Sequence, residues 1–517
     1  MKPLAANDTA RRAIGGLVAV AGTWWLFALL LPAGSFPVGW DPWWNLHVAR
    51  TIAESGFPDA VPQAGWTQLG RDYADRQWLF HLVLAAVGGR DLGPQHVPAL
   101  CATFAVALVV TVLLCARRLV GARHAVAPVL LLWGLSSTAL FRATALRDML
   151  LAVLPLLVLV TRLAVAPARP RRADHGWLFA AGLVFTLAHG AVVLPLALAV
   201  VACLGRRLDG LAFAPRLLAS LCLGVAVGAV ARPNPLGSLE LLWTLNVFLP
   251  WSAANGDLPI QPSEFAALPL GQLLRGSWPL FGLCCAVVAA TVRRRRGFAV
   301  ALPAAALTLG AVFGARLLEL AVPFTVLAAL VALGERPQRA AWRLEALGAV
   351  AAAGLGWLAA SVAQPSLDAN RFVALADVAR ELRQRARPGD VVFVTDWGVT
   401  SPLSFLTRDV PLRFTGVTDP VLMLREDPAA FAAWWQVRSA ADPQAAATMR
   451  RTFGARFAVV GFADHVAGRP VGETAVRVWQ SAGELERSGT AVRSQDFPSP
   501  PLHRALEPGF RLYQFGR

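Results

Sequence analysis

Long apolar runs recur through the first two thirds of this chain and limit what it can fold into. A helix needs about 20 apolar residues to cross the hydrocarbon core of a bilayer. With 56% hydrophobic and only 15% charged residues, the chain has more apolar surface than a soluble globular protein needs. The sequence therefore predicts a polytopic α-helical membrane protein with about eleven transmembrane helices. The candidate spans are 13–33, 97–116, 125–141, 149–166, 176–188, 190–204, 211–230, 277–292, 297–314, 317–334 and 344–363.

The positive charge of the chain follows the order of these spans. Residues 365–517 carry 19 arginines against 16 acidic residues, so most of the net charge of +16 lies in the short loops of the apolar part. Arginine clusters in alternate loops mark the cytoplasmic side, which places the N-terminus inside and, after an odd number of spans, the C-terminal part outside. This pattern is a topology signal, and we expect no nucleic-acid binding.

The cellular compartment is indicated by three further features. The run 13–33 is longer than the apolar core of a secretion signal and has no small-x-small cleavage site, so we expect an uncleaved first span. All six cysteines lie in apolar segments, which argues against a disulfide framework. Lys2 is the only lysine beside many arginines and alanines, as is typical of GC-rich bacterial genomes. We expect a protein of the bacterial inner (plasma) membrane.

Two long loops and a change in the hydrophobic pattern near residue 365 divide the chain. Residues 1–364 are predicted to form a transmembrane domain with long external loops at 34–96 and 231–276. Loop 34–96 contains the stretch 76–84, which is too short to span and is predicted to be a helix lying in the membrane interface. From residue 365 onward, helical periodicity alternates with short β-branched runs, which predicts an extracytoplasmic α/β domain over 365–517.

Asp41 lies just outside the first predicted span, with Trp40, Trp43 and Trp44 close to it in the sequence. A carboxylate at this depth can position or deprotonate an acceptor nucleophile, or bind a divalent metal. The alternative is structural, because Asp41-Pro42 is also a good helix start, with Asp as the N-cap and Pro at the first helical position. Both interpretations can hold together.

Two further external turns carry charge. Arg147-Asp148 lies between the spans 125–141 and 149–166, and Arg316 lies in Ala-Arg-Leu-Leu-Glu-Leu-Ala-Val-Pro-Phe at 315–324. A guanidinium at such a position can bind a lipid phosphate through paired donors. The alternatives are a helix N-terminal charge for Asp148 and, for Arg316, a helix pair with Glu319 or a snorkelling side chain.

Residues 39–57 resemble the start of the first external loop in the catalytic subunit of oligosaccharyltransferase. That family reads Asp-Pro-Trp-Phe-Asn-(Tyr/Trp)-Arg there, followed by a helix that ends Ala-Glu-x-Gly-Phe, and this chain reads Asp41-Pro-Trp-Trp-Asn and Ala-Glu-Ser-Gly-Phe57. The segment 315–324 is similar to the family's Val-Arg-Leu-x-x-x-x-x-Pro. The resemblance implies the GT-C architecture of membrane glycosyltransferases, with Asp41 and Asp148 as catalytic residues and Arg316 and Arg147 on the donor phosphate.

The resemblance also implies a metal and an acceptor site, with departures. A divalent cation (Mg or Mn) would be held by Asp41 and Asp148, but Asp148 is followed by Met149 where the family has a second acid. Asp396 and Trp397 match part of the family's acceptor-recognition motif without its tryptophan pair, and Asp-Trp-Gly after a strand is also ordinary turn chemistry. The remaining acceptor-site candidates are Glu264 (with Asp257 as its alternative) in the second long loop, and His47 and His81, for which a satisfied or interfacial histidine is the alternative.

The expected function is transfer of a sugar from a polyprenyl-phosphate-linked donor to an extracytoplasmic acceptor by inverting direct displacement. The acceptor is a glycan, a lipid or a protein, and membrane lipids are the other partners. One alternative is an oligosaccharyltransferase that moves a diphosphate-linked oligosaccharide to protein Asn. The other is a non-catalytic relative that binds or transports polyprenyl lipids, although transporters place their acids at mid-membrane and here they stand at span ends.

Overall fold

The fold is known from a computed structural model that describes most of the chain. The described residues are 3–31, 37, 39–120, 129, 131–255, 269–333, 354–361, 372–416, 420–439, 441–461, 491–497 and 510–515. The chain forms two compact units. The helical unit comprises Met1–Ser35, Arg76–Phe80 and Gln95–Leu367, and the sheet-containing unit comprises Phe36–Asp75, His81–Pro94 and Asp368–Arg517.

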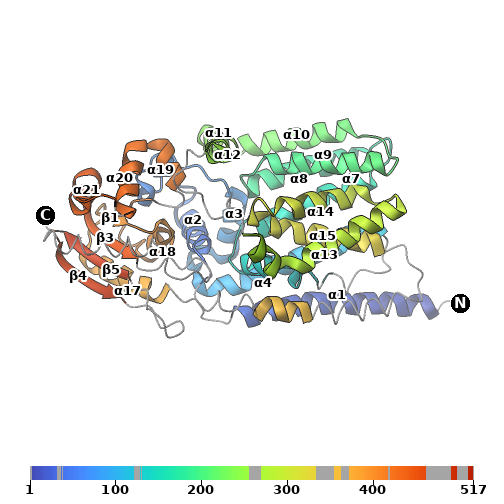
Figure 1. The fold of residues 1–517 in the computed structure, drawn as a ribbon, viewed down its shortest axis with the longest axis horizontal. Coiled ribbons are helices and arrows are strands. Elements are labelled where there is room, and N and C mark those ends of the chain that lie inside the picture. The colour runs from blue at the N-terminus through green and yellow to red at the C-terminus, as the bar shows by residue number, and fades with distance from the viewer. Residues whose placement is uncertain are drawn as a thin grey trace. The chain divides into compact units, whose positions relative to one another are not determined.

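The helical unit is built of apolar helices joined by short turns (Figure 1). Helix α8 packs on α7 and α10, while α14 packs on α9 and α15, and α4 lies against α1 and α7. Leucine, valine and alanine on these faces form the core, and the Ser136 and Ser277 hydroxyls share a hydrogen bond of 2.7 Å between helices. The helices are α1 (Pro3–Leu30), α4 (Val97–Val120), α6 (Ser137–Ala143), α7 (Met149–Val165), α8 (Arg172–Ala188), α9 (Val193–Leu208), α10 (Pro215–Val230), α11 (Pro235–Trp243), α12 (Leu249–Ala254), α13 (Leu270–Arg294), α14 (Phe298–Gly310) and α15 (Leu318–Leu333).

Three helical stretches in the described residues are long and apolar enough to cross a membrane, namely Pro94–Val120, Leu270–Arg294 and Ala315–Ala332. A fourth is reached if the pair Pro215–Val230 and Pro235–Ser252, bent by 116°, counts as one span. Gly15–Leu30, Met149–Val165 and Phe298–Gly310 are apolar but shorter. The mostly helical architecture is therefore confirmed, whereas the count of eleven spans stays a prediction.

One expected span is interrupted, and another lies mostly outside the description. Within 125–141, the described residues form a 3-10 turn at Leu131–Trp133 and then the short helix α6, not one continuous helix. The break has a local cause, because the Ser136 side chain accepts a hydrogen bond from Ala139 N at 3.1 Å and so starts a new helix. Of the expected span 344–363, only 354–361 is described, and it is helical.

The sheet-containing unit joins segments from both ends of the sequence. Its five strands run in the order β2-β1-β3-β5-β4, with β1, β2 and β3 parallel and β5 antiparallel to β3 and β4. They are β1 (Val391–Val394), β2 (Arg413–Phe414), β3 (Ala455–Gly461), β4 (Ala491–Phe497) and β5 (Phe510–Phe515). The helices are α2 (Asp41–Ser55), α17 (Phe372–Arg385), α18 (Thr400–Leu406), α19 (Pro420–Glu426), α20 (Pro428–Arg438) and α21 (Ala445–Phe453), together with the part of α3 (Trp78–Gly88) from His81 onward.

The β-branched runs that predict strands in the C-terminal domain are 391–394 and 457–460, and both form strands, as predicted. The structure adds that these two strands are parallel neighbours in the sheet. Both strands consist largely of aromatic and β-branched residues, and Phe393 and Phe457 are fully buried. Trp434 of α20 is also fully buried and donates from Nε1 to the carbonyl oxygen of Val394 at 2.9 Å. A small C-terminal sheet covered by helices therefore follows the helical part of the chain, as the sequence predicts.

Candidate functional site

In the helical unit, a buried acid and a buried histidine meet at the turn before α7. Asp148 is 4% exposed and His189, at the end of α8, is 6% exposed. His189 donates from Nδ1 to Asp148 Oδ2 in a short hydrogen bond. Leu146 in the turn has φ of 40°, a left-handed conformation that side chains with a Cβ seldom adopt. Such strain persists where the surrounding structure fixes it, often at functional sites.

Arginines surround this acid. Burial alone would raise the pKa of Asp148, but the His189 ring and the positive charges of Arg76 and Arg316 outweigh burial and hold that pKa below its usual range. Arg147, beside Asp148 in the chain, is 9% exposed. The turn therefore holds an ionised carboxylate in a positive environment.

Segments distant in sequence position the parts of this cluster. Gly190, next to His189, lies so close to Arg76 that a Cβ at Gly190 would be 3.2 Å from the Cβ of Arg76. Its carbonyl oxygen accepts a hydrogen bond from the Asn246 amide at 2.7 Å. The loop predicted at 231–276 thus contains helical segments, and its π-helical turn Thr244–Phe248 supports the histidine turn.

Arg316 lies in the 3-10 turn Ala315–Leu317 that leads into α15, and it is partly buried. Glu319, one turn later, forms an ion pair with Arg142 of α6. That carboxylate is thereby bound to a neighbouring helix, which fixes the start of α15 beside α6. The turn that presents Arg316 is therefore anchored from a second helix.

The surroundings of Asp148 do not fit a divalent cation. Its carboxylate is already bonded to His189 and lies in the positive field of Arg76 and Arg316. No group of three or more histidine, cysteine or acidic side chains able to hold a metal occurs among the residues that the structure describes. Asp41 belongs to the other unit and is described with it.

In the sheet-containing unit, Asp41 is the first residue of α2 and is partly buried. The N-cap position is occupied by Trp40, whose side chain makes no capping hydrogen bond, so Asp41 lies in the first turn rather than at the cap. A carboxylate there is favoured by the helix dipole. The Trp43 ring packs edge-on against Phe405 of α18 at 5.7 Å between centroids, which fixes the helix on the C-terminal segment.

The motif at 396–398 lies next to the start of α2. Asp396 accepts a hydrogen bond from Gly398 N at 2.9 Å, which is the turn chemistry that the sequence offers as the alternative. A Cβ at Gly398 would be 2.7 Å from the Trp40 indole, so the glycine allows the ring to pack on this turn. Trp397 is partly buried in the same turn. The structure therefore brings Asp396 and Trp397 close to the residue that precedes Asp41.

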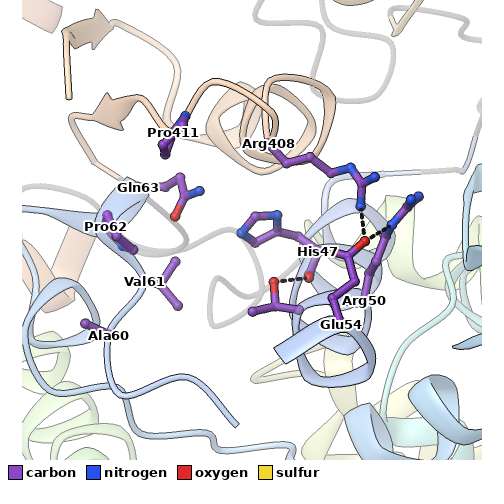
Figure 2. A pocket seen from close by; sticks show the side chains of 10 residues that line it. His47, Arg50, Glu54, Ala60, Val61, Pro62, Gln63, Arg408 and Pro411 are labelled. Atoms are coloured by element: carbon purple, nitrogen blue, oxygen red, sulfur yellow. Dashed lines mark hydrogen bonds and ion pairs between the residues drawn. The ribbon is translucent and has the colours of Figure 1, made fainter. Parts of the chain in front are cut away.

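The two histidine candidates have different surroundings. His81 is 1% exposed, donates from Nδ1 to Asp75 Oδ2 at 2.6 Å, and shares a hydrogen bond through Nε2 with Asn45 Oδ1 at 3.0 Å. Asn45 is one helical turn after Asp41, so this chain of hydrogen bonds anchors α2. His47 instead lines a cavity of about 190 Å³ (Figure 2). The alternative of a satisfied core histidine thus fits His81 but not His47.

Two candidate residues lie outside the described part of the chain, and two residues of the cluster around Asp148 were not predicted from the sequence. Glu264 and its alternative Asp257 fall within 256–268, outside the described residues. His189 and Arg76 were not among the candidate residues. The available signals are His189-Gly190, which the sequence allows as a tight external turn or as a kink in one long helix, and an arginine at the start of the predicted interface helix. Neither points to Asp148 without a three-dimensional contact.

Comparison with known proteins supports the fold. No protein-family model and no curated protein matches the chain by sequence. Among solved structures, ArnT from Cupriavidus metallidurans bound to undecaprenyl phosphate is similar with a TM-score of 0.59 and 16% identity, over 96% of this chain and 97% of that one.

Two other glycosyltransferases share the arrangement. The Archaeoglobus fulgidus oligosaccharyltransferase tethered with an acceptor peptide is similar with a TM-score of 0.59 and 15% identity, over 86% of this chain and 69% of that one. The mycobacterial arabinofuranosyltransferase AftD is similar with a TM-score of 0.51 and 17% identity, over 97% of this chain but 40% of that one. All three are GT-C glycosyltransferases, and the resemblance of this chain to that fold is confirmed.

Proposed function

We propose that this protein is a membrane glycosyltransferase that moves a sugar from a polyprenyl-phosphate-linked donor to an extracytoplasmic acceptor. Its fold is similar to that of GT-C glycosyltransferases over most of the chain. The ArnT structure contains undecaprenyl phosphate, and a further structure of the Archaeoglobus fulgidus oligosaccharyltransferase, in complex with an inhibitory peptide, contains dolichol phosphate. A lipid-linked donor fits a chain in which apolar helices carry charged turns.

The observation that carries the proposal is the buried Asp148–His189 pair in the field of Arg76 and Arg316. Cleavage of a sugar from a lipid phosphate develops negative charge on the leaving oxygen, and fixed guanidinium donors stabilise that charge. Asp148 with a lowered pKa is a weak base, so its role is to hold the arginines in place before the donor arrives. Arg316 and Arg147 bind the phosphate in this scheme, and Arg76 joins them.

Asp41 serves the acceptor. The acceptor hydroxyl attacks the anomeric carbon from the side opposite the phosphate, the bond between that carbon and the phosphate oxygen breaks, and the hydroxyl proton passes to the Asp41 carboxylate. One displacement of this kind inverts the anomeric configuration. Asp396 and Trp397, next to the start of α2, shape the acceptor site.

Oligosaccharyltransfer is the second candidate, and the similarity to the archaeal enzyme with its acceptor peptide favours it. The two candidates differ in the donor, which is a monophosphate in the first and a diphosphate in the second. The similarity to the undecaprenyl-phosphate-bound structure extends over nearly the full length of both chains, and supports the first.

The test is binding of a labelled polyprenyl monophosphate to the purified protein, with unlabelled mono- and diphosphates as competitors. Arg316→Ala is expected to weaken binding about tenfold or more, because a charge-assisted bidentate contact is lost. Arg275→Ala is the matched control, since Arg275 is exposed on α13 and, among the residues that the structure describes, bonds only within its own helix, donating to the Gly271 carbonyl oxygen at 3.2 Å.

The same proteins are then expressed in a host whose glycans and lipids are profiled, together with Asp41→Asn. A sugar modification that appears with wild type and disappears with Asp41→Asn is expected. If the protein binds the lipid tightly but no sugar modification appears in a host supplied with the donor, the proposed transferase activity is contradicted. The protein would then be a polyprenyl-lipid-binding protein.

A further inference from the structure

The cavity in the sheet-containing unit is lined by two buried polar side chains that form no hydrogen bond with the residues that the structure describes. His47 of α2 and Gln63 of the following turn are each 7% exposed and line the cavity. Neither the His47 ring nor the Gln63 amide makes a hydrogen bond with any residue that the structure describes. Figure 2 shows both side chains extending into the same space from different elements. Buried polar groups in folded proteins nearly always have partners, so the His47 ring and the Gln63 amide bind either water or a polar ligand in the cavity.

The charged side chains that line the cavity are held in place by hydrogen bonds to one another. Glu54 Oε1 accepts hydrogen bonds from Arg50 Nε at 2.8 Å and from Arg408 Nη1 at 2.9 Å. One carboxylate thus holds two guanidiniums from segments far apart in the sequence (Figure 2). The other Glu54 oxygen accepts no hydrogen bond from a described residue, and the remaining N–H groups of Arg408 stay available as donors.

The hydrogen-bonding pattern of the lining selects the chemical class of the occupant. Burial and the charge of Arg408 lower the pKa of His47 to about 4, so at neutral pH the ring is uncharged and offers one donor and one acceptor. Gln63 also offers both, Glu54 only accepts, and Arg408 only donates. Hydroxyl groups, which donate and accept, match all four, whereas an anion would meet the Glu54 carboxylate.

Size and apolar surface narrow the class to a sugar. The cavity measures about 190 Å³, against the roughly 10–15 Å³ that one water molecule needs and the roughly 300–1,000 Å³ of sites for drug-sized ligands. It therefore suits one ring rather than an oligosaccharide. Val61 and Pro411 add apolar surface to the lining, against which the C–H face of a sugar ring can pack.

We propose that the cavity lined by His47, Gln63, Glu54 and Arg408 is a subsite for one neutral sugar ring of the acceptor. The proposal rests on the proposed function and adds to it the class of acceptor, a glycan or glycolipid rather than a bare peptide. His47 and Gln63 bind sugar hydroxyls, and the Glu54 pairing sets the orientation of the ring.

The test measures sugar binding alone, with no donor and no transfer step. The full-length protein is reconstituted in lipid nanodiscs, so that no sugar-based detergent competes. Methyl α-glycosides of mannose, glucose, galactose and arabinose are titrated by saturation-transfer NMR, with glucuronate as an anionic probe of the same size. At least one neutral glycoside is expected to bind saturably.

Gln63→Met keeps the volume of the side chain and removes its hydrogen bonds, and it is expected to weaken that binding by about tenfold, the effect of losing one or two hydrogen bonds. His47→Phe is a second variant that fills the same space and is expected to act in the same direction. Gln436→Met is the matched control, because Gln436 is exposed on α20 of the same unit.

Each outcome decides the proposal. Saturable binding that Gln63→Met weakens and Gln436→Met leaves unchanged supports it, even if no transfer is ever detected and the proposed function fails. Binding that is equal in wild type and Gln63→Met, or no binding of any glycoside by the folded wild type, overturns it while leaving the proposed function to its own assay. Binding of glucuronate without any neutral glycoside also overturns it, and assigns the cavity to carboxylates.

Discussion

At the scale of single residues, Asp148 is the acid whose loss has the largest expected cost. Asp148→Asn removes the negative charge that balances Arg76 and Arg316 and leaves His189 with a weaker partner. Removing a buried charge that balances neighbouring charges costs roughly 3–5 kcal/mol. We expect a marked fall in the thermal midpoint in detergent. Asp409→Asn is the comparison, since its pair with Arg383 at 2.7 Å is half exposed and is expected to be worth roughly 1 kcal/mol or less. Equal effects of the two variants would refute the special role of Asp148.

His47 gives a prediction for pH. Burial and Arg408 lower its pKa from 6.5 to about 4, with Glu54 acting in the opposite direction. The unfolded chain therefore binds a proton more readily between these values, so stability is complete above pH 6.5 and falls as the pH drops toward 4. The shift corresponds to roughly 3 kcal/mol. We expect the thermal midpoint of the wild type to fall more steeply over this range than that of His47→Asn. Parallel profiles for the two proteins would contradict the buried neutral ring.

At the scale of elements, the contact between the start of α2 and the turn at 396–398 positions Asp41. A methyl group at Gly398 would lie 2.7 Å from the Trp40 indole, so Gly398→Ala must displace the ring and with it the first turn of α2. We expect transfer activity to fall more than tenfold, because errors of about 1 Å in a catalytic group are costly. Gly282→Ala is the control, since a Cβ there meets no atom within 4 Å. Unchanged activity in folded Gly398→Ala would show that Asp41 does not depend on this contact.

The same scale shows which features the sequence can predict. The strand at 391–394 follows from its own β-branched residues, and α7 and α15 follow from local apolar runs, because these signals lie within one element. The break at 131–136 depends on the Ser136 side chain, which caps a new helix. The mean hydropathy of the segment does not reveal such a cap. The partnership of Asp148 with His189 joins residues 41 positions apart, and only the packing of α7 on α8 brings them together. Site residues on one turn were thus predictable, whereas their partners on other helices were not.

At the scale of the whole molecule, the C-terminal segment is not expected to fold stably without the N-terminal segment that contains α2. Trp43 and Leu46 of α2 are fully buried in the unit that contains the sheet, and α18 packs on that helix. A fragment of residues 368–517 therefore lacks part of its own core. We expect it to bind a hydrophobic dye and to unfold without a sharp transition. Joining residues 36–75 to it through a flexible linker is expected to restore cooperative unfolding. A fragment that is cooperative without that addition would contradict this view.

The bridge from Glu54 to Arg408 has a consequence for biogenesis. Its two ends are 354 positions apart, and a ribosome adds roughly 5–20 residues per second. The helix that carries Glu54 therefore waits on the order of twenty to seventy seconds, with its tryptophans uncovered, before the segment that completes it is made. During that interval the nascent protein is open to aggregation and proteolysis. We expect this early segment to depend on a chaperone, or to escape proteolysis, until the segment that carries Arg408 has been made.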